Sequence, residues 1–93
     1  MRRLELHLEH RFKDRVLRSH RLRPEDKART MGSANTADFH LTGEQVSGFH
    51  AAIEFRQDHW MISDTCSGSG TWISKEAIVE YPINEPITVR IAQ

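Results

Sequence analysis

The sequence predicts an all-β fold, a sandwich of two antiparallel sheets, and three observations lead to this prediction. Apolar residues alternate with polar ones at a period of two almost wherever they cluster, as they do on half-buried strands. No segment of ten or more residues holds a convincing helical stripe of apolar residues. The apolar segments are short and closely spaced, with turn residues between them, which is typical of a sandwich or a small barrel.

The first half of the chain begins with the clearest alternation. Leu4, Leu6 and Leu8 alternate with glutamates and a histidine, which predicts a strand exposed on one face. A polar turn at 12–14 separates this strand from the next, and a Pro-Glu-Asp break at 24–26 follows the second strand. The strands expected in this half are residues 4–9, 16–22, 27–31 and 39–41.

The second half continues with a hairpin, residues 51–55 and 60–64, across a turn at 56–59. The side chains expected in the core share the inward side of this hairpin: Ala51, Ile53, Phe55, Trp60 and Ile62. The segment DTCSGSG that follows is rich in loop-forming residues. The remaining expected strands are residues 71–73, 78–81 and 87–91, with Pro82 and Pro86 bounding the turn between the last two.

Length and composition indicate a single domain over residues 1–93, and whether it is the N-terminal module of a longer protein stays open. The chain is 38% apolar and 28% charged, which suffices for one modest core. Cys66 is the only cysteine, which excludes an internal disulfide and favours a cytoplasmic location. No apolar run approaches the roughly 18 residues of a membrane span, and charges interrupt the N-terminus too often for a signal peptide.

The net charge of zero hides an uneven distribution of charge along the chain. Residues 1–30 carry ten lysines and arginines against five acidic residues, whereas residues 31–93 carry three against eight, so the two parts bear +5 and −5. A basic region of this kind attracts nucleic acid, phosphopeptides or anionic lipid. Because no aromatic residues interleave with the arginines as a stacking surface requires, we expect a solvated basic rim and no nucleic-acid partner.

Three polar, glycine-bearing loops follow or precede predicted strands. They contain Gly-Ser at 32–33, Ser-Gly-Phe-His at 47–50, and an Asp-x-x-Ser-x-Ser-Gly-Thr segment over 64–71. Loops of a sandwich gather at its two ends, so these three could meet at one end and form a shallow, hydroxyl-rich site. Rigid scaffolds with such loops commonly bind ligands there.

The order and spacing of these motifs resemble the signature of the forkhead-associated domain, which is Gly-Arg, then Ser-x-x-His, then Asp-x-x-Ser-x-Asn-Gly-Thr. The resemblance covers about residues 27 to 91. It implies an eleven-stranded β-sandwich with its binding loops at one end. For function it implies a reader of phosphothreonine peptides, whose partner is a protein or a phosphothreonine-containing peptide.

The resemblance also implies a role for each matching residue. The positions it assigns to phosphopeptide binding are Ser33, Ser47, Gly48 and Ser69. The positions it assigns to loop structure are Gly32, which permits a turn, His50, which ties the binding loop to its neighbours, Gly70 and Thr71. Two positions depart from the family, because Ser33 replaces the phosphate-clamping arginine and Ser69 replaces the asparagine that holds the peptide backbone. The arginines that could replace the clamp are Arg15, Arg18, Arg21, Arg23 and Arg29.

Two functions therefore stay open. One is a phosphothreonine-peptide-binding module in bacterial signalling or secretion regulation, which Ser47 and the surplus of arginines favour. The other is a degenerate scaffold that binds proteins or oligomerises without phosphate, which Ser33 and Ser69 favour. Such scaffolds resemble domains at the cytoplasmic N-terminus of bacterial secretion-system ring proteins.

Other functions are not expected. A Ser47–His50 nucleophile–base pair would need a third orienting group and an oxyanion site, so we do not expect an enzyme. The six histidines lack ligand-type spacing, so neither a metal nor another cofactor is expected. We also expect no membrane contact by this domain, and the oligomeric state is left open.

Overall fold

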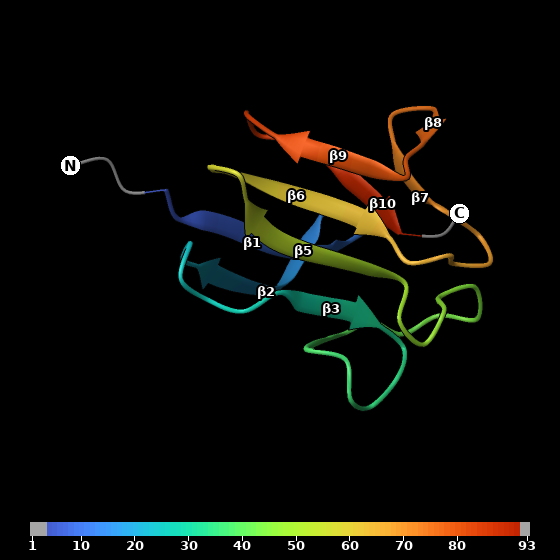
Figure 1. Ribbon diagram of the computed structural model, residues 1–93. Helices are drawn as coiled ribbons and strands as arrows, with labels where there is room; N and C mark the ends of the chain where they lie inside the picture. Colours follow the sequence, from blue (N-terminus) through green and yellow to red (C-terminus); the bar gives the residue numbers. More distant parts are fainter. Residues whose placement is uncertain (1–3, 92–93) are drawn as a thin grey trace.

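The computed structural model describes residues 4–91, and within this range it contains ten strands and no helix (Figure 1). The strands are β1 (Leu6–Phe12), β2 (Arg15–Leu22), β3 (Arg29–Gly32), β4 (Phe39–His40), β5 (Ala51–Arg56), β6 (His59–Asp64), β7 (Thr71–Ile73), β8 (Glu76–Ala77), β9 (Glu80–Ile83) and β10 (Val89–Ile91). The prediction of an all-β fold is confirmed. The described residues include no helix that is long and apolar enough to cross a membrane.

The larger layer is a five-stranded sheet in the order β4-β3-β5-β6-β9. Its centre is the β5–β6 hairpin, in which Arg56 and His59 form the closing pair. The two residues between them, Gln57 and Asp58, have φ values of 53° and 69°, as a type I′ hairpin turn requires. This turn fixes the register of the hairpin and thereby directs Ile53 and Ile62, which are paired across it, to the same face.

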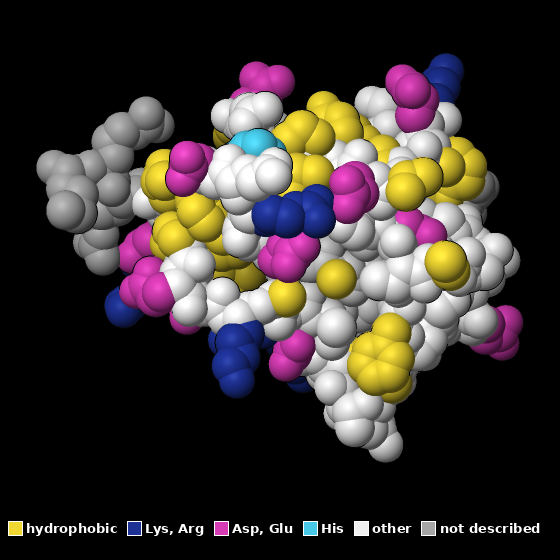
Figure 2. Space-filling view, viewed as in Figure 1, with side chains coloured by type: hydrophobic (Ala, Val, Ile, Leu, Met, Phe, Trp, Pro, Cys, Tyr) yellow, Lys and Arg dark blue, Asp and Glu magenta, His cyan; other side chains and the backbone are white. Residues whose placement is uncertain are grey.

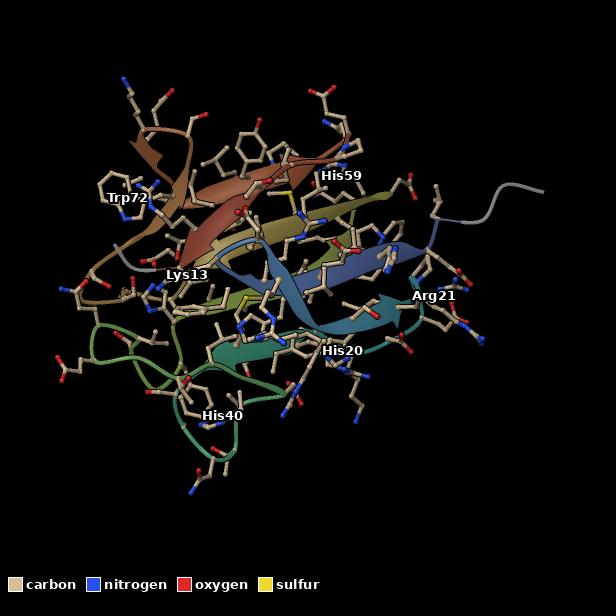
Figure 3. All side chains as sticks on the ribbon, turned by 180° about the vertical axis from the view of Figure 1, so that it is seen from behind. Lys13, His20, Arg21, His40, His59 and Trp72 are labelled. Atoms are coloured by element: carbon tan, nitrogen blue, oxygen red, sulfur yellow. The ribbon has the colours of Figure 1, made fainter. Side chains whose placement is uncertain are left out.

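Two smaller antiparallel sheets, β1-β2 and β10-β7-β8, form the layer behind the five-stranded sheet. Figure 1 shows β1 and β10 behind the larger sheet and β7 and β8 at its right end, and Figure 3 shows the β1–β2 hairpin in front when the molecule is seen from behind. The expected sandwich of two antiparallel sheets thus differs in detail. The second layer is divided because no ladder joins β1 to β10, and the larger sheet is mixed because β3 and β4 pair in parallel.

Both layers contribute to one core. Its buried members are Leu22, Met31, Ala51, Ile53, Trp60 and Ile62. Four of the five predicted core residues are therefore buried, whereas Phe55 is only half-buried, because it lies near the end of β5 and packs its ring edge-on against Trp60 at 5.4 Å. The Trp60 indole also donates a hydrogen bond to the carbonyl of Leu4 (2.8 Å), which fastens the start of the chain to the larger sheet.

The C-terminal strands depart most from the prediction. β8 was not expected, and Pro82 lies inside β9, paired with Met61, rather than in a turn. β9 tolerates a proline because it is the edge strand of its sheet, where a missing N–H leaves no ladder bond unmade. Met61 is buried on the face opposite Ile62, between its cross-strand partners Glu54 and Pro82.

Replacing Ile53 by alanine should lower the free energy of unfolding by about 2–4 kcal/mol, because the side chain is 1% exposed at the centre of the core and its loss leaves a cavity. Val79→Ala is the matched control, since Val79 is 78% exposed, and we expect a change below about 0.5 kcal/mol. Urea unfolding followed by tryptophan fluorescence measures both. Similar values for the two variants would contradict the assigned core.

Candidate functional site

The three predicted loops meet at one end of the sandwich, where β3 and β6 end and β5 begins (Figure 1). The loop after β3 bonds to the loop before β5 through the amide of Ser33 and the carbonyl of Ser47 (3.0 Å). The loop after β6 joins them through the amide of Gly68 and the hydroxyl oxygen of Ser47 (3.0 Å). Ser47 is therefore in contact with both neighbouring loops.

Gly32, at the end of β3, allows the first two loops to lie this close. A Cβ atom at this position would lie 2.1 Å from the carbonyl oxygen of Gly48 and 2.7 Å from that of Ser47. Its φ is not in the positive region, so no turn requires a glycine there. The turn-forming role expected of Gly32 is thus corrected, because the position needs a glycine for the close approach of two backbones.

His50 connects the loop before β5 to the loop after β6. Its side chain is fully buried, and its Nδ1 accepts a hydrogen bond from the amide of Ser47 (3.0 Å). The ring proton therefore sits on Nε2, which donates to the carbonyl of Gly70 (2.7 Å). The backbone of His50 is also paired, with the carbonyl of Met31 (2.8 Å) and the amide of Thr65 (3.1 Å). His50 thus makes the hydrogen bonds between loops that the family resemblance implies for it.

Asp64, the last residue of β6, organises the loop that follows it. Its carboxylate accepts hydrogen bonds from the hydroxyl of the fully buried Thr71 (2.8 Å) and from both the amide and the hydroxyl of Ser67. Burial alone would raise the pKa of the Asp64 carboxyl, but the hydrogen bonds from Ser67 and Thr71 together outweigh it and hold the pKa below its ordinary value. The carboxylate thus stays ionised and acts as the centre of a loop network.

Gly70 adopts a conformation that a side chain would not permit. Its φ is 93°, and a Cβ atom there would lie 2.8 Å from the Nε1 of Trp72. That indole N–H donates to the carbonyl of Ser69 (3.0 Å), and the guanidinium of Arg90 lies 5.7 Å from the ring. Figure 3 shows Trp72 at the β7 end of this loop. Gly70 therefore lets the chain turn tightly over Trp72 and aim its carbonyl at His50.

The serines predicted to contact a ligand use their hydroxyl groups differently. Ser33 donates to the carbonyl of Val46 (2.9 Å), and Ser69 donates to that of Gln45 (2.6 Å). Ser47 accepts from Gly68, and its own proton has no acceptor among the described residues. Only Ser47 therefore retains a hydroxyl proton for a ligand without a rearrangement of the loops.

A shallow hollow of about 580 Å³ opens between the loop before β5 and the loop after β6. Its lining residues are Glu44, Gln45, Val46, Ser47, Gly68 and Ser69. The hollow thus includes two of the four residues predicted for peptide binding, while Ser33 and Gly48 do not line it. The sequence interpretation missed the other four, although three of them immediately precede Ser47 in a segment recognised as a loop.

Among the described residues, no lysine or arginine lines the hollow. Glu44 is its only charged lining residue, and none of the arginines proposed to replace the clamp lines it. Arg29 instead donates to the carbonyl of Lys27 (2.9 Å). On the face shown in Figure 2, no lysine or arginine is visible over the loops at the lower right.

The geometry of the loops also bears on catalysis and on metal binding. It is the amide of Ser47, not its hydroxyl, that bonds to the His50 ring, so the pair lacks the bond of a nucleophile to its base. Among residues 4–91, no three His, Cys, Asp or Glu side chains lie close enough to hold a metal ion. Cys66 is exposed in the loop after β6.

Comparison with known proteins gives a consistent result. A family model described as the FHA domain matches residues 29–92. The FHA domain of CT664 from Chlamydia trachomatis is similar at a TM-score of 0.80 and 21% identity, over 92% of this chain and 87% of that one. FHA-1 of Rv1747 from Mycobacterium tuberculosis is similar at a TM-score of 0.78 and 16% identity, over 96% of this chain and 84% of that one.

A further similar structure is EmbR from Mycobacterium tuberculosis in complex with a low affinity phosphopeptide, at a TM-score of 0.71 and 27% identity. The similarity covers 80% of this chain and 19% of EmbR. A comparison with curated protein sequences gave no match.

His50→Ala should lower the free energy of unfolding by about 1–3 kcal/mol, because it removes a fully buried ring and leaves the part-buried Ser47 amide and Gly70 carbonyl without their partners. The Ser47 amide should also lose protection from hydrogen exchange, which a general loss of packing would not single out. His7→Ala, at an exposed position of β1, is the control and should leave both quantities unchanged. A His50 variant with the parent's stability and Ser47 exchange rate would contradict the role given to the ring.

Asp64→Asn should lower the free energy of unfolding by about 1–2 kcal/mol at pH 7, because the charged acceptor of three hydrogen bonds is replaced by a neutral amide. The lowered folded-state pKa means that the carboxylate stabilises the fold above its unfolded value, near pH 3.9, and that this stability is lost as the pH falls through the folded value. The stability of the parent should therefore exceed that of Asp64→Asn by a constant amount above about pH 4, and the two should converge as the pH falls further.

Urea unfolding across this pH range measures the effect, and Glu85→Gln, at an exposed loop position, is the control that should follow the parent at every pH. A difference between parent and Asp64→Asn that stays constant down to pH 3 would contradict the assignment.

Proposed function

Because the chain belongs to the FHA domain family, we propose that its loop end binds a segment of a partner protein without requiring a phosphate on that segment. Members of this family are generally phosphothreonine-dependent protein-interaction modules. This chain keeps the scaffold of such a module. A phosphate-independent use of the loop site is the proposal that its charges support best.

The observation that carries the proposal is the charge of the hollow. A phosphothreonine brings nearly two negative charges at neutral pH, and the only charged group that lines the hollow is the carboxylate of Glu44. A charge-assisted hydrogen bond contributes about 1.5–3 kcal/mol, and a site without a cation loses this contribution. A site without a cation should therefore bind phosphate roughly ten- to a hundredfold more weakly than one with an arginine clamp.

The state of Ser33 supports the same proposal. Its hydroxyl already donates to the carbonyl of Val46, and turning it toward a ligand would leave that carbonyl unpaired. Ser69 is engaged in the same manner with Gln45. The two serines that depart from the family signature thus use their hydroxyl groups to join the loops to each other. Neither hydroxyl proton is left for a ligand.

An unphosphorylated segment would still find suitable partners here. The Ser47 hydroxyl can donate to a carbonyl or side-chain oxygen, and the exposed backbone of the loop around Gly68 offers further polar groups. These donors are neutral, and they suit an extended peptide better than a dianion beside a carboxylate. We place the domain in bacterial signalling or secretion regulation as part of the same proposal.

Phosphothreonine binding is the second candidate function, and one observation favours it. Ser47 borders the hollow with its proton free, at the position that the family resemblance assigns to the phosphate contact. Backbone N–H groups in glycine-containing loops supply further donors to anions without a charged side chain. EmbR, which is similar in fold, is known in complex with a low affinity phosphopeptide.

A titration with a library of threonine-centred peptides, each in phosphorylated and unphosphorylated form, tests the proposal. We expect the parent to bind selected members with affinities that differ by less than about threefold between the two forms, since no cation rewards the phosphate. Ser33→Arg should make the phosphorylated form bind roughly ten- to a hundredfold more tightly, because a guanidinium can clamp the phosphate with two bonds.

Ser33→Gln is the matched control, since it adds length without charge and should create no preference for phosphate. A parent that prefers the phosphorylated peptides by about tenfold or more would replace the proposal with the second candidate. A parent that binds no peptide at the loop end in either form would overturn both.

A further inference from the structure

Strand β2 leaves one backbone edge without a partner among the described residues. It belongs to a two-stranded sheet and pairs with β1 alone, so its other edge carries free N–H and C=O groups. All but two of its eight residues are exposed, the exceptions being His20 and Leu22 near its end. The hairpin is anchored at its open end, where Leu22 of β2 is buried in the core and Leu6 of β1 packs against it.

Three arginines lie along this strand without an acidic partner. Across the ladder, Arg15 faces Phe12, Arg18 faces His10 and Arg21 faces His7. Among the described residues, none of the three arginines takes part in an ion pair.

The positive charge of the strand also reaches its neighbours. Partial burial, and then the charges of Arg18 and His20, lower the pKa of His10. Figure 3 places Lys13 at the turn of the hairpin and Arg21 near its opposite end, so positive groups occur along its length.

Apolar side chains accompany this charge. Val16 and Leu17 are 49% and 50% exposed, and Phe12 at the turn is 61% exposed. Leu17 is the extra residue of an irregularity in the ladder, between the pairs His10–Arg18 and Arg11–Val16. The distal part of the hairpin thus presents apolar side chains on which a partner could pack. A two-stranded hairpin is marginally stable alone in water, so a third strand would also stabilise it.

We propose that the free edge of β2 is a docking strand for an extended acidic segment of a partner protein, which adds to the β1–β2 sheet as a third strand. The backbone groups would supply hydrogen bonds, as in other cases of strand addition. Acidic side chains opposite Arg15, Arg18 and Arg21 would form the ion pairs that the ladder lacks, and apolar ones between them would cover Val16 and Leu17.

The arginines and the free backbone edge of β2 together favour an acidic strand over a second copy of the chain and over a lipid surface. A second copy of the chain is disfavoured, because pairing of β2 with another β2 would bring the arginines of two strands together without carboxylates between them. A lipid surface would attract the arginines but would leave the free backbone groups of the edge without partners in its apolar region. An acidic strand satisfies both the charge and the backbone.

The test uses the parent chain and a fluorescein-labelled peptide with glutamate at every third position and valine between, which is the spacing of Arg15, Arg18 and Arg21. A peptide of equal length with lysine in place of glutamate is the matched probe. We expect the acidic peptide to bind and its affinity to fall as salt rises, and we expect no binding of the basic one. Hydrogen exchange by nuclear magnetic resonance should show new protection of amides along β2 and none at the loops around Ser47.

The triple variant Arg15→Glu, Arg18→Glu, Arg21→Glu should lose affinity for the acidic peptide by about tenfold or more. All three side chains are exposed, so the fold should persist, and circular dichroism checks that it does. Lys75→Glu, in the exposed turn between β7 and β8, is the control for a loss of positive charge elsewhere and should bind like the parent.

Several results would overturn the proposal. Binding of the acidic peptide without new protection of the β2 amides would mean that the peptide binds through charge alone and does not add a strand. Binding to vesicles of phosphatidylserine and phosphatidylcholine in equal amounts, without peptide binding, would make lipid the occupant. A dimer whose formation protects the β2 amides would make a second copy the occupant. Failure of the parent to bind the peptide at low salt would exclude an acidic strand.

Discussion

The loop end of this domain depends on one buried imidazole. His50 receives the amide of Ser47 on one ring nitrogen and donates to the carbonyl of Gly70 with the other, so a single side chain sets the separation of two loops. This works only in the neutral tautomer with the proton on Nε2, which the two partners together select. The ring is fully buried, and each loop therefore has the rigid core as its support. The position of Ser47 at the hollow follows from this arrangement.

The remaining constraints act on the same small volume. Gly32 allows the backbone at Ser47 and Gly48 to approach β3, and Gly70 allows the chain to fold over Trp72. The hydroxyls of Ser33 and Ser69 then join the loops from within. A loop end held by so many internal bonds needs little reorganisation to bind, which favours a neutral, extended ligand. The loop end also has few hydrogen-bond donors without an internal partner. The loss of a cationic side chain therefore lowers its affinity for a phosphate dianion strongly.

Sequence periodicity predicted the all-β fold, the β5–β6 hairpin and four buried residues correctly, because alternation along a strand is a local property. Phe55 fits the same alternation but lies near the end of its strand, where the opposite layer covers it only in part. The family resemblance identified the loops that meet and the role of His50 in tying them together. It did not reveal the contact that makes Gly32 necessary, the inward direction of the Ser33 hydroxyl, or the lining role of Glu44. These depend on how loops distant in sequence pack, which no local pattern encodes.

The charge asymmetry of the sequence becomes spatial in the fold. The β1–β2 hairpin carries much of the arginine excess of the first 30 residues and forms a sheet of its own, whereas the only charged residue among those that line the hollow is Glu44. Among the described residues, no ion pair joins Glu44 to the arginines of β2, and salt screens the attraction between exposed charges. Each surface therefore keeps its own preference, and the arginines that a phosphate site would require stand on the strand edge instead. The two surfaces are thus expected to select chemically different segments, a neutral one at the loops and an acidic one along β2.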